Sequence, residues 1–78
     1  MPKNPLKNIP LKTFMQYLEW NGLEYIRTKG GHEVWNKEGM KRPVILPIHE
    51  DLVYEFVTKN ALRNMETGIE NYIEFLKS

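Results

Sequence analysis

A Gly-Gly pair in the middle of residues 23–36 constrains the fold of this chain more than any other feature. Segments rich in β-branched and aromatic residues lie on both sides of Gly30 and Gly31. On the far side an apolar residue stands beside a polar one twice, Val34 beside Glu33 and Trp35 beside Asn36. Because β-branched and aromatic residues are typical of strands and paired glycines are typical of tight turns, residues 23–36 are predicted to form a β-hairpin.

Helical spacing of apolar residues precedes and follows this hairpin. Before it, apolar residues recur at the i, i+3, i+4 and i+7 positions of an amphipathic helix over residues 11–21, and Asn21 and Gly22 supply a stop signal. The helical period returns between residues 53 and 65. Asp51 is a reasonable N-cap for this second helix, although its first turn could equally start a few residues later.

Residues 67–78 are predicted to form a short third helix. Thr67 and Glu70 have the Thr-x-x-Glu form of a capping box, and an apolar face continues after them. At the other end of the chain, residues 1–10 contain three prolines and are predicted to be an extended arm. Residues 44–48 are an apolar run bounded by prolines and too short for a helix, so we expect a third strand, broken or bent at Pro47.

The predicted order is therefore helix, three strands, helix, helix, in a single domain that covers residues 1–78. This order indicates an α+β fold, in which the helices pack on one face of a small three-stranded antiparallel sheet. The opposite face is left to solvent or to a partner.

Length and composition exclude several classes of protein. A chain of 78 residues forms one modest core, because domains of this size bury only about 60% of the surface of the unfolded chain. There is no apolar run of membrane-spanning length and no basic-then-apolar leader, so neither a membrane span nor export is expected. The absence of cysteine fits the reducing cytoplasm. With a net charge of only +1, any attraction to phosphate depends on where the charges lie.

His32, directly after the glycine pair, is the first candidate for chemistry. An unperturbed histidine titrates at about pH 6.5, so it can accept and donate a proton at neutral pH, as cleavage of RNA by its own 2′-hydroxyl requires. Gly30 and Gly31 place no side chain beside the imidazole, which lets a nucleic-acid backbone approach closely. The simpler interpretation of His32 is a polar residue that flanks a turn.

His49, at the end of the third predicted strand, is the second candidate. It could support His32, or it could cap the following helix or bond to a neighbouring carbonyl. Two histidines without any cysteine are a weak signal for a metal site, so we expect no metal.

Basic residues gather around the hairpin and in the loop after it. Arg27 and Lys29 belong to the first strand of the hairpin, and three more follow its second strand: Lys37, Lys41 and Arg42. They are either a solvated rim or phosphate ligands, since arginine binds phosphate through two parallel hydrogen bonds and lysine acts as a point charge. Lys59 and Arg63, four residues apart on one helical face, could add a second phosphate contact.

Taken together, these motifs resemble the HicA (YcfA-like) toxins of bacterial and archaeal toxin–antitoxin systems. The resemblance extends from about residue 11 to about residue 65. It rests on the Asn-Gly that ends the first helix, the Arg-x-Lys-Gly-x-His motif of residues 27–32, and the Pro-x-His of residues 47–49.

The resemblance implies a fold similar to that of double-stranded-RNA-binding domains. It also implies an mRNA interferase, an endoribonuclease that cleaves RNA without a metal or other cofactor and is silenced by a HicB-like antitoxin. His32 matches the catalytic histidine of the family, and His49 matches its Pro-x-His position. Two features depart from the family pattern: Gly31 stands where a serine is usual, and residues 56–60 keep only part of the usual start of the second helix.

Two other functions compete with this one. The first is a non-catalytic module that binds double-stranded RNA by its shape, through a basic edge and a helix N-terminus. The second is a protein-binding domain whose exposed sheet face or edge contacts a partner.

Overall fold

The predicted hairpin is present, and it is part of a three-stranded antiparallel sheet in the computed structural model, which describes residues 4–78. β2 (Glu24–Lys29) pairs with β3 (His32–Asn36), and β3 pairs with β4 (Val44–Pro47). Gly30 and Gly31 have φ angles of 57° and 77°. Because L side chains rarely adopt positive φ, this two-residue turn favours glycine at both positions.

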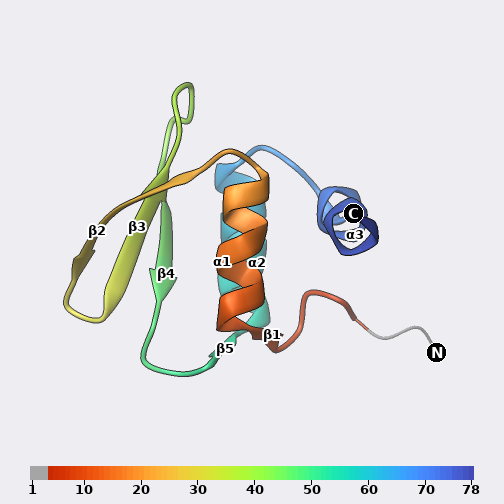
Figure 1. Ribbon diagram of the computed structural model, residues 1–78, viewed down its shortest axis with the longest axis horizontal. Coiled ribbons are helices and arrows are strands. Elements are labelled where there is room, and N and C mark those ends of the chain that lie inside the picture. Colours follow the sequence, from red (N-terminus) through yellow and green to blue (C-terminus); the bar gives the residue numbers. More distant parts are fainter. Residues whose placement is uncertain (1–3) are drawn as a thin grey trace.

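Two of the predicted helices pack beside this sheet (Figure 1). α1 (Leu11–Trp20) has almost the predicted bounds, and the chain leaves it through Gly22 at a φ of 87°. α2 (Glu55–Asn64) begins later than Asp51, so the later of the two starts considered for this helix is correct.

Asp51 is not an N-cap, because the segment after it is held in a strand. β5 (Leu52–Val53) pairs antiparallel with β1 (Ile9–Pro10), a two-stranded sheet that the sequence pattern did not predict. The backbone carbonyl of Asp51 accepts a hydrogen bond from the Leu11 N–H at 2.7 Å. Tyr54 is the actual N-cap of α2, and its side chain makes no capping bond.

The N-terminal arm is extended in part, and it is anchored to the rest of the domain. Leu6 and Ile9 are only 5% and 2% exposed, so the arm contributes apolar side chains to the core. Residues 1–3 of the predicted arm lie outside the described residues.

α3 (Ile69–Lys77) confirms the predicted third helix but not its capping box. Gly68 is the N-cap, and no side chain caps the helix. The helix packs against α1 rather than against the sheet (Figure 1), with the ring of Tyr72 edge-on to that of Tyr17 at a centroid distance of 4.9 Å. α3 therefore forms a layer beyond α1 and leaves the sheet to α1 and α2.

The core lies between α1, α2 and one side of the sheet. The strands contribute alternate residues: Trp35, Val44 and Leu46. The helices contribute the following: Phe14, Tyr17, Leu18, Val57, Ala61 and Leu62. Since side chains alternate along a strand, His32, Ile45 and Pro47 point away from these core residues. None of the helices within residues 4–78 is long and apolar enough to cross a lipid bilayer.

Burial of Tyr17 is expected to make the folded protein less stable at alkaline pH. Its side chain is fully buried and donates a hydrogen bond to Asn71 Oδ1, and burial raises the pKa of Tyr17 from 10.0 to about 12. Between these values the unfolded chain loses the tyrosine proton while the folded chain keeps it, so stability present below pH 10 is lost as the pH rises toward 12.

We therefore expect Tyr17→Phe to lose less stability than the wild type between pH 9 and pH 11.5, by on the order of 2 kcal/mol. Urea unfolding at several pH values measures this difference. At pH 8 the variant is expected to be less stable by about 1 kcal/mol, because the bond to Asn71 is lost. Parallel pH profiles for the two proteins would show that Tyr17 does not cause the alkaline loss.

Candidate active site at the hairpin turn

The register of the hairpin brings cations beside the first histidine. Lys29 lies directly opposite His32, and Arg27 lies opposite Val34, the next residue on the same side of β3. Directly opposed residues point to the same side of a sheet, so Arg27, Lys29 and His32 share one side. Both cations are exposed.

The imidazole of His32 is partly buried and is held by the turn. Its Nδ1 lies 3.1 Å from the carbonyl oxygen of Gly30. A carbonyl can only accept a hydrogen bond, so this contact assigns the ring proton of the neutral imidazole to Nδ1. Nε2 is then left with a free lone pair that can accept a proton.

The second histidine lies next to the first. The ring centroids of His32 and His49 are 5.5 Å apart, and the ring planes meet edge to face at 87°. His49 reaches this position because the Ile48 N–H donates to the Gly31 carbonyl at 3.0 Å, which ties the end of β4 to the hairpin turn. The capping role considered for His49 is wrong, since α2 starts after Tyr54 and has no side-chain cap.

Gly31 is the residue that makes room for His49. A Cβ atom at Gly31 would lie 2.1 Å from Cε1 and 2.7 Å from Nε2 of the His49 ring. A Cβ at Gly30 would have nothing within 4 Å. The two glycines therefore have different roles. Both allow the positive φ angles of the turn, but only Gly31 also leaves space for the ring of His49. Gly31 is also the position at which the resemblance to HicA places a serine.

A groove of about 400 Å³ leads from His32 along the boundary between β4 and α2. Its walls carry Ile45 and Pro47 from β4 and Phe56 and Asn60 from α2. Apart from His32, its charged residues are two arginines, Arg42 and Arg63.

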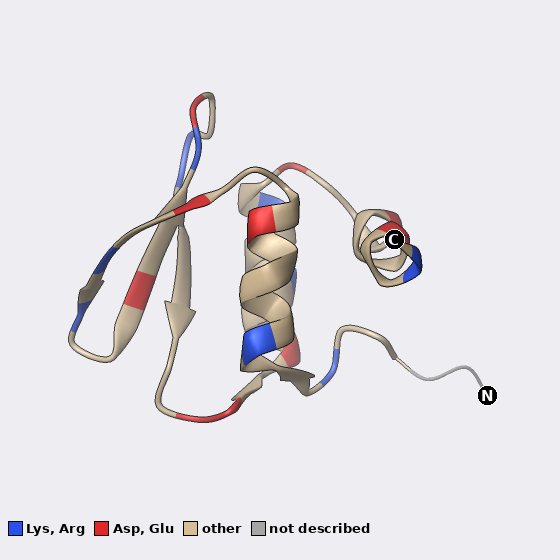
Figure 2. Ribbon diagram, viewed as in Figure 1, with Lys and Arg blue, Asp and Glu red and all other residues tan. Residues whose placement is uncertain are grey.

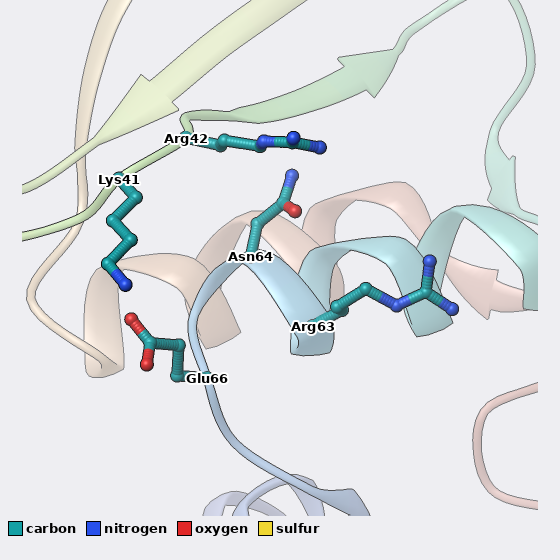
Figure 3. A pocket seen from close by; sticks show the side chains of 5 residues that line it. All are labelled: Lys41, Arg42, Arg63, Asn64 and Glu66. Carbon is teal, nitrogen blue, oxygen red and sulfur yellow. The ribbon is translucent and has the colours of Figure 1, made fainter.

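The groove continues into a smaller hollow at the end of α2 (Figure 3). Asn64 Nδ2 donates to the Pro43 carbonyl at 3.0 Å, which fixes α2 against the loop before β4. In this view Arg42 and Arg63 extend in the same direction on the two sides of Asn64, one from the loop and one from the helix. The bond from Asn64 therefore holds the bases of both arginines in place.

The remaining predicted phosphate ligands lie outside the groove. Lys59 forms the only salt bridge found within residues 4–78, with Nζ 2.8 Å from Glu55 Oε2. Arg27 and Lys29 share the side of His32 but do not line the groove. Figure 2 shows Lys and Arg on β2 near the hairpin turn and on the loop between β3 and β4, at opposite ends of the sheet.

Sequence reasoning did not single out Arg42 or the asparagines of α2. Arg42 was one of several loop cations, and nothing in the sequence distinguished it from Lys37 or Lys41. The i, i+3, i+4 spacing of Asn60, Arg63 and Asn64 is the signal that could have shown a polar stripe on α2 facing the sheet.

The chemistry of this arrangement is proton transfer next to cations. Within the described part of the chain, no group of three or more His, Asp or Glu side chains is placed to hold a metal ion. Two imidazoles can exchange protons with a bound molecule, and the neighbouring arginines and lysine can bind an anion. No protein-family model, curated protein or solved structure is significantly similar to this chain.

Proposed function

We propose that this protein is a metal-independent endoribonuclease that cleaves mRNA, the toxin of a type II toxin–antitoxin system of the HicA kind, neutralised by a HicB-like antitoxin. The observation that carries the proposal is the position of His32. Its Nδ1 is held by the Gly30 carbonyl, which leaves the Nε2 lone pair to accept a proton, and the side chain lines a groove together with Arg42 and Arg63. The side that it shares with Arg27 and Lys29 adds two exposed cations.

In the proposed reaction His32 acts as the general base. Nε2 accepts the proton of a ribose 2′-hydroxyl, and the 2′ oxygen attacks the adjacent phosphorus. The bond from phosphorus to the 5′ oxygen of the next nucleotide breaks, which leaves a 2′,3′-cyclic phosphate and a 5′-hydroxyl end. Arg27 and Lys29 hold the phosphate and stabilise the negative charge that develops on its oxygens.

The fold supports a path for RNA across this side of the molecule. Apart from the two-residue strands β1 and β5, the order of α1, β2, β3, β4 and α2 is the α-β-β-β-α order that the resemblance implies, and we propose a fold of the double-stranded-RNA-binding-domain type. The strand enters along the groove between β4 and α2, where Arg42 and Arg63 contact successive phosphates. It then passes His32 and leaves over Arg27 and Lys29.

The test is incubation of the purified protein with an mRNA transcript in the presence of a chelator, with mapping of the new ends. Cleavage that persists with EDTA and yields cyclic phosphate ends is expected. Tight, salt-sensitive binding without any cleavage would replace the proposal with the non-catalytic RNA-binding module. Absence of both binding and cleavage would leave the protein-binding domain as the remaining function.

Removal of both groove arginines is expected to weaken RNA binding and its salt dependence. For Arg42→Ala combined with Arg63→Ala, the slope of log K against log salt should fall by about 0.7 for each lost phosphate contact with single-stranded RNA. Fluorescence anisotropy at several salt concentrations measures this slope. The matched control, Lys12→Ala with Lys77→Ala, removes the same charge from α1 and α3 and should keep the wild-type slope. Equal losses in both variants would indicate that net charge, not the groove, attracts RNA.

A further inference from the structure

We propose that His49 is a second catalytic residue, which donates a proton to the leaving 5′ oxygen while His32 accepts the proton of the 2′-hydroxyl. This inference rests on the proposed ribonuclease function and assigns the half of the proton transfer that His32 cannot perform. The attacking and leaving oxygens lie roughly in line on opposite sides of phosphorus. A single imidazole that is already receiving one proton cannot give another to the far side.

The geometry of the two rings fits this division. A centroid distance of 5.5 Å brings both imidazoles within reach of one phosphodiester, and the edge-to-face angle of 87° directs their nitrogens differently. His49 is exposed, so its ring nitrogens are open to a bound strand. The backbone bond from Ile48 to Gly31 keeps the end of β4 beside the turn that holds His32.

The fold gives no other reason for a histidine at this position. Among the side-chain hydrogen bonds found within residues 4–78 none involves His49, and His49 caps no helix. It lies over Gly31, and a Cβ atom at Gly31 would force its ring to shift. The position of the exposed His49 imidazole against that of His32 is therefore better explained by a role in proton transfer than by a role in packing.

The contacts of each ring separate the two roles. Nδ1 of His32 is engaged with the Gly30 carbonyl, so the neutral ring presents Nε2 as an acceptor. The His49 ring is not held by a carbonyl in this way, and in its protonated form it can donate from either nitrogen. The cations around His32 are Arg27 and Lys29, on the same side of the hairpin, and Arg42 and Arg63, which line the groove with it. Glu50 and Tyr54 line a hollow with His49.

The proton balance of the step is complete. The 2′ oxygen gives its proton to His32 and forms a bond to phosphorus. The bond between phosphorus and the 5′ oxygen breaks, its electron pair stays on that oxygen, and His49 supplies the proton. Water then returns the two imidazoles to their starting protonation states.

The test compares ordinary RNA with the same oligonucleotide carrying sulfur in place of the scissile 5′ oxygen, because a thiolate leaves without being protonated. On ordinary RNA, His49→Ala should lower the cleavage rate by about 10²-fold or more. On the sulfur substrate the rate of His49→Ala should approach that of the wild type, whereas His32→Ala should be slow on both. The wild type should show a bell-shaped dependence of rate on pH, and His49→Ala should lose the limb that falls at high pH.

His49→Gln is the matched control for a merely structural role. It keeps the size and polarity of the side chain but carries no transferable proton, so it should be as slow as His49→Ala. Circular dichroism checks that both variants are folded. A wild-type rate for His49→Gln, or no rescue of His49→Ala by the sulfur substrate, would overturn the role of His49 and leave the nuclease function intact. Failure of the wild type to cleave either RNA would overturn the nuclease function itself.

Discussion

His32→Ala is expected to lower the rate of RNA cleavage by about 10³-fold, within the range that a positioned general base contributes. The physical reason is that the bond from Nδ1 to the Gly30 carbonyl leaves the lone pair of His32 Nε2 to accept the proton, and alanine has no such group. The cleavage rate of a labelled transcript measures the effect, and expression in cells should no longer arrest growth.

Two controls separate loss of chemistry from loss of structure or of binding. RNA affinity of His32→Ala should remain near that of the wild type, because Arg42 and Arg63 still line the groove. Added imidazole should restore part of the cleavage rate by entering the space of the missing side chain. If His32→Ala arrests cells and degrades RNA as fully as the parent, the base is another group.

The local part of this fold could be predicted from sequence, because the signals are short in range. The turn at Gly30 and Gly31 and the period of α1 depend on neighbouring residues, and both elements are present. β1 and β5 could not be predicted, since a two-residue strand has no periodicity and exists only through its distant partner. That pairing also explains why α2 starts late: it keeps the backbone at Leu52 and Val53 extended.

In the candidate site, too, contacts between neighbouring segments could be predicted from the sequence, whereas contacts between distant segments could not. Lys29 and His32 are opposed through a hairpin, so their proximity follows from the turn alone. The contact between His32 and His49 requires the pairing of β3 with β4, and the arginine groove requires the packing of α2 against β4. From the sequence we expect Gly31 to leave room for a nucleic-acid backbone and to lack the serine of the family, whereas in the structure that space is filled by His49.

Gly31→Ala is expected to be nearly as damaging to cleavage as His49→Ala, about 10²-fold, although the methyl group touches no substrate. The reason is steric: the new Cβ would lie 2.1 Å from His49 Cε1, so the imidazole must leave its present position beside His32. If this displacement is the cause, the double variant Gly31→Ala/His49→Ala should be no slower than either single variant, a strongly non-additive result.

Gly30→Ala separates this steric effect from backbone strain. Both glycines have positive φ, at 57° and 77°, so each alanine should cost about 1–2 kcal/mol of stability in thermal or urea unfolding. Only Gly31→Ala should shift the NMR signals of the His49 ring, because a Cβ at Gly30 meets nothing within 4 Å. Additive losses of rate in the double variant, or unchanged His49 signals in Gly31→Ala, would show that Gly31 matters only for the turn and that the two imidazoles do not depend on the space it leaves.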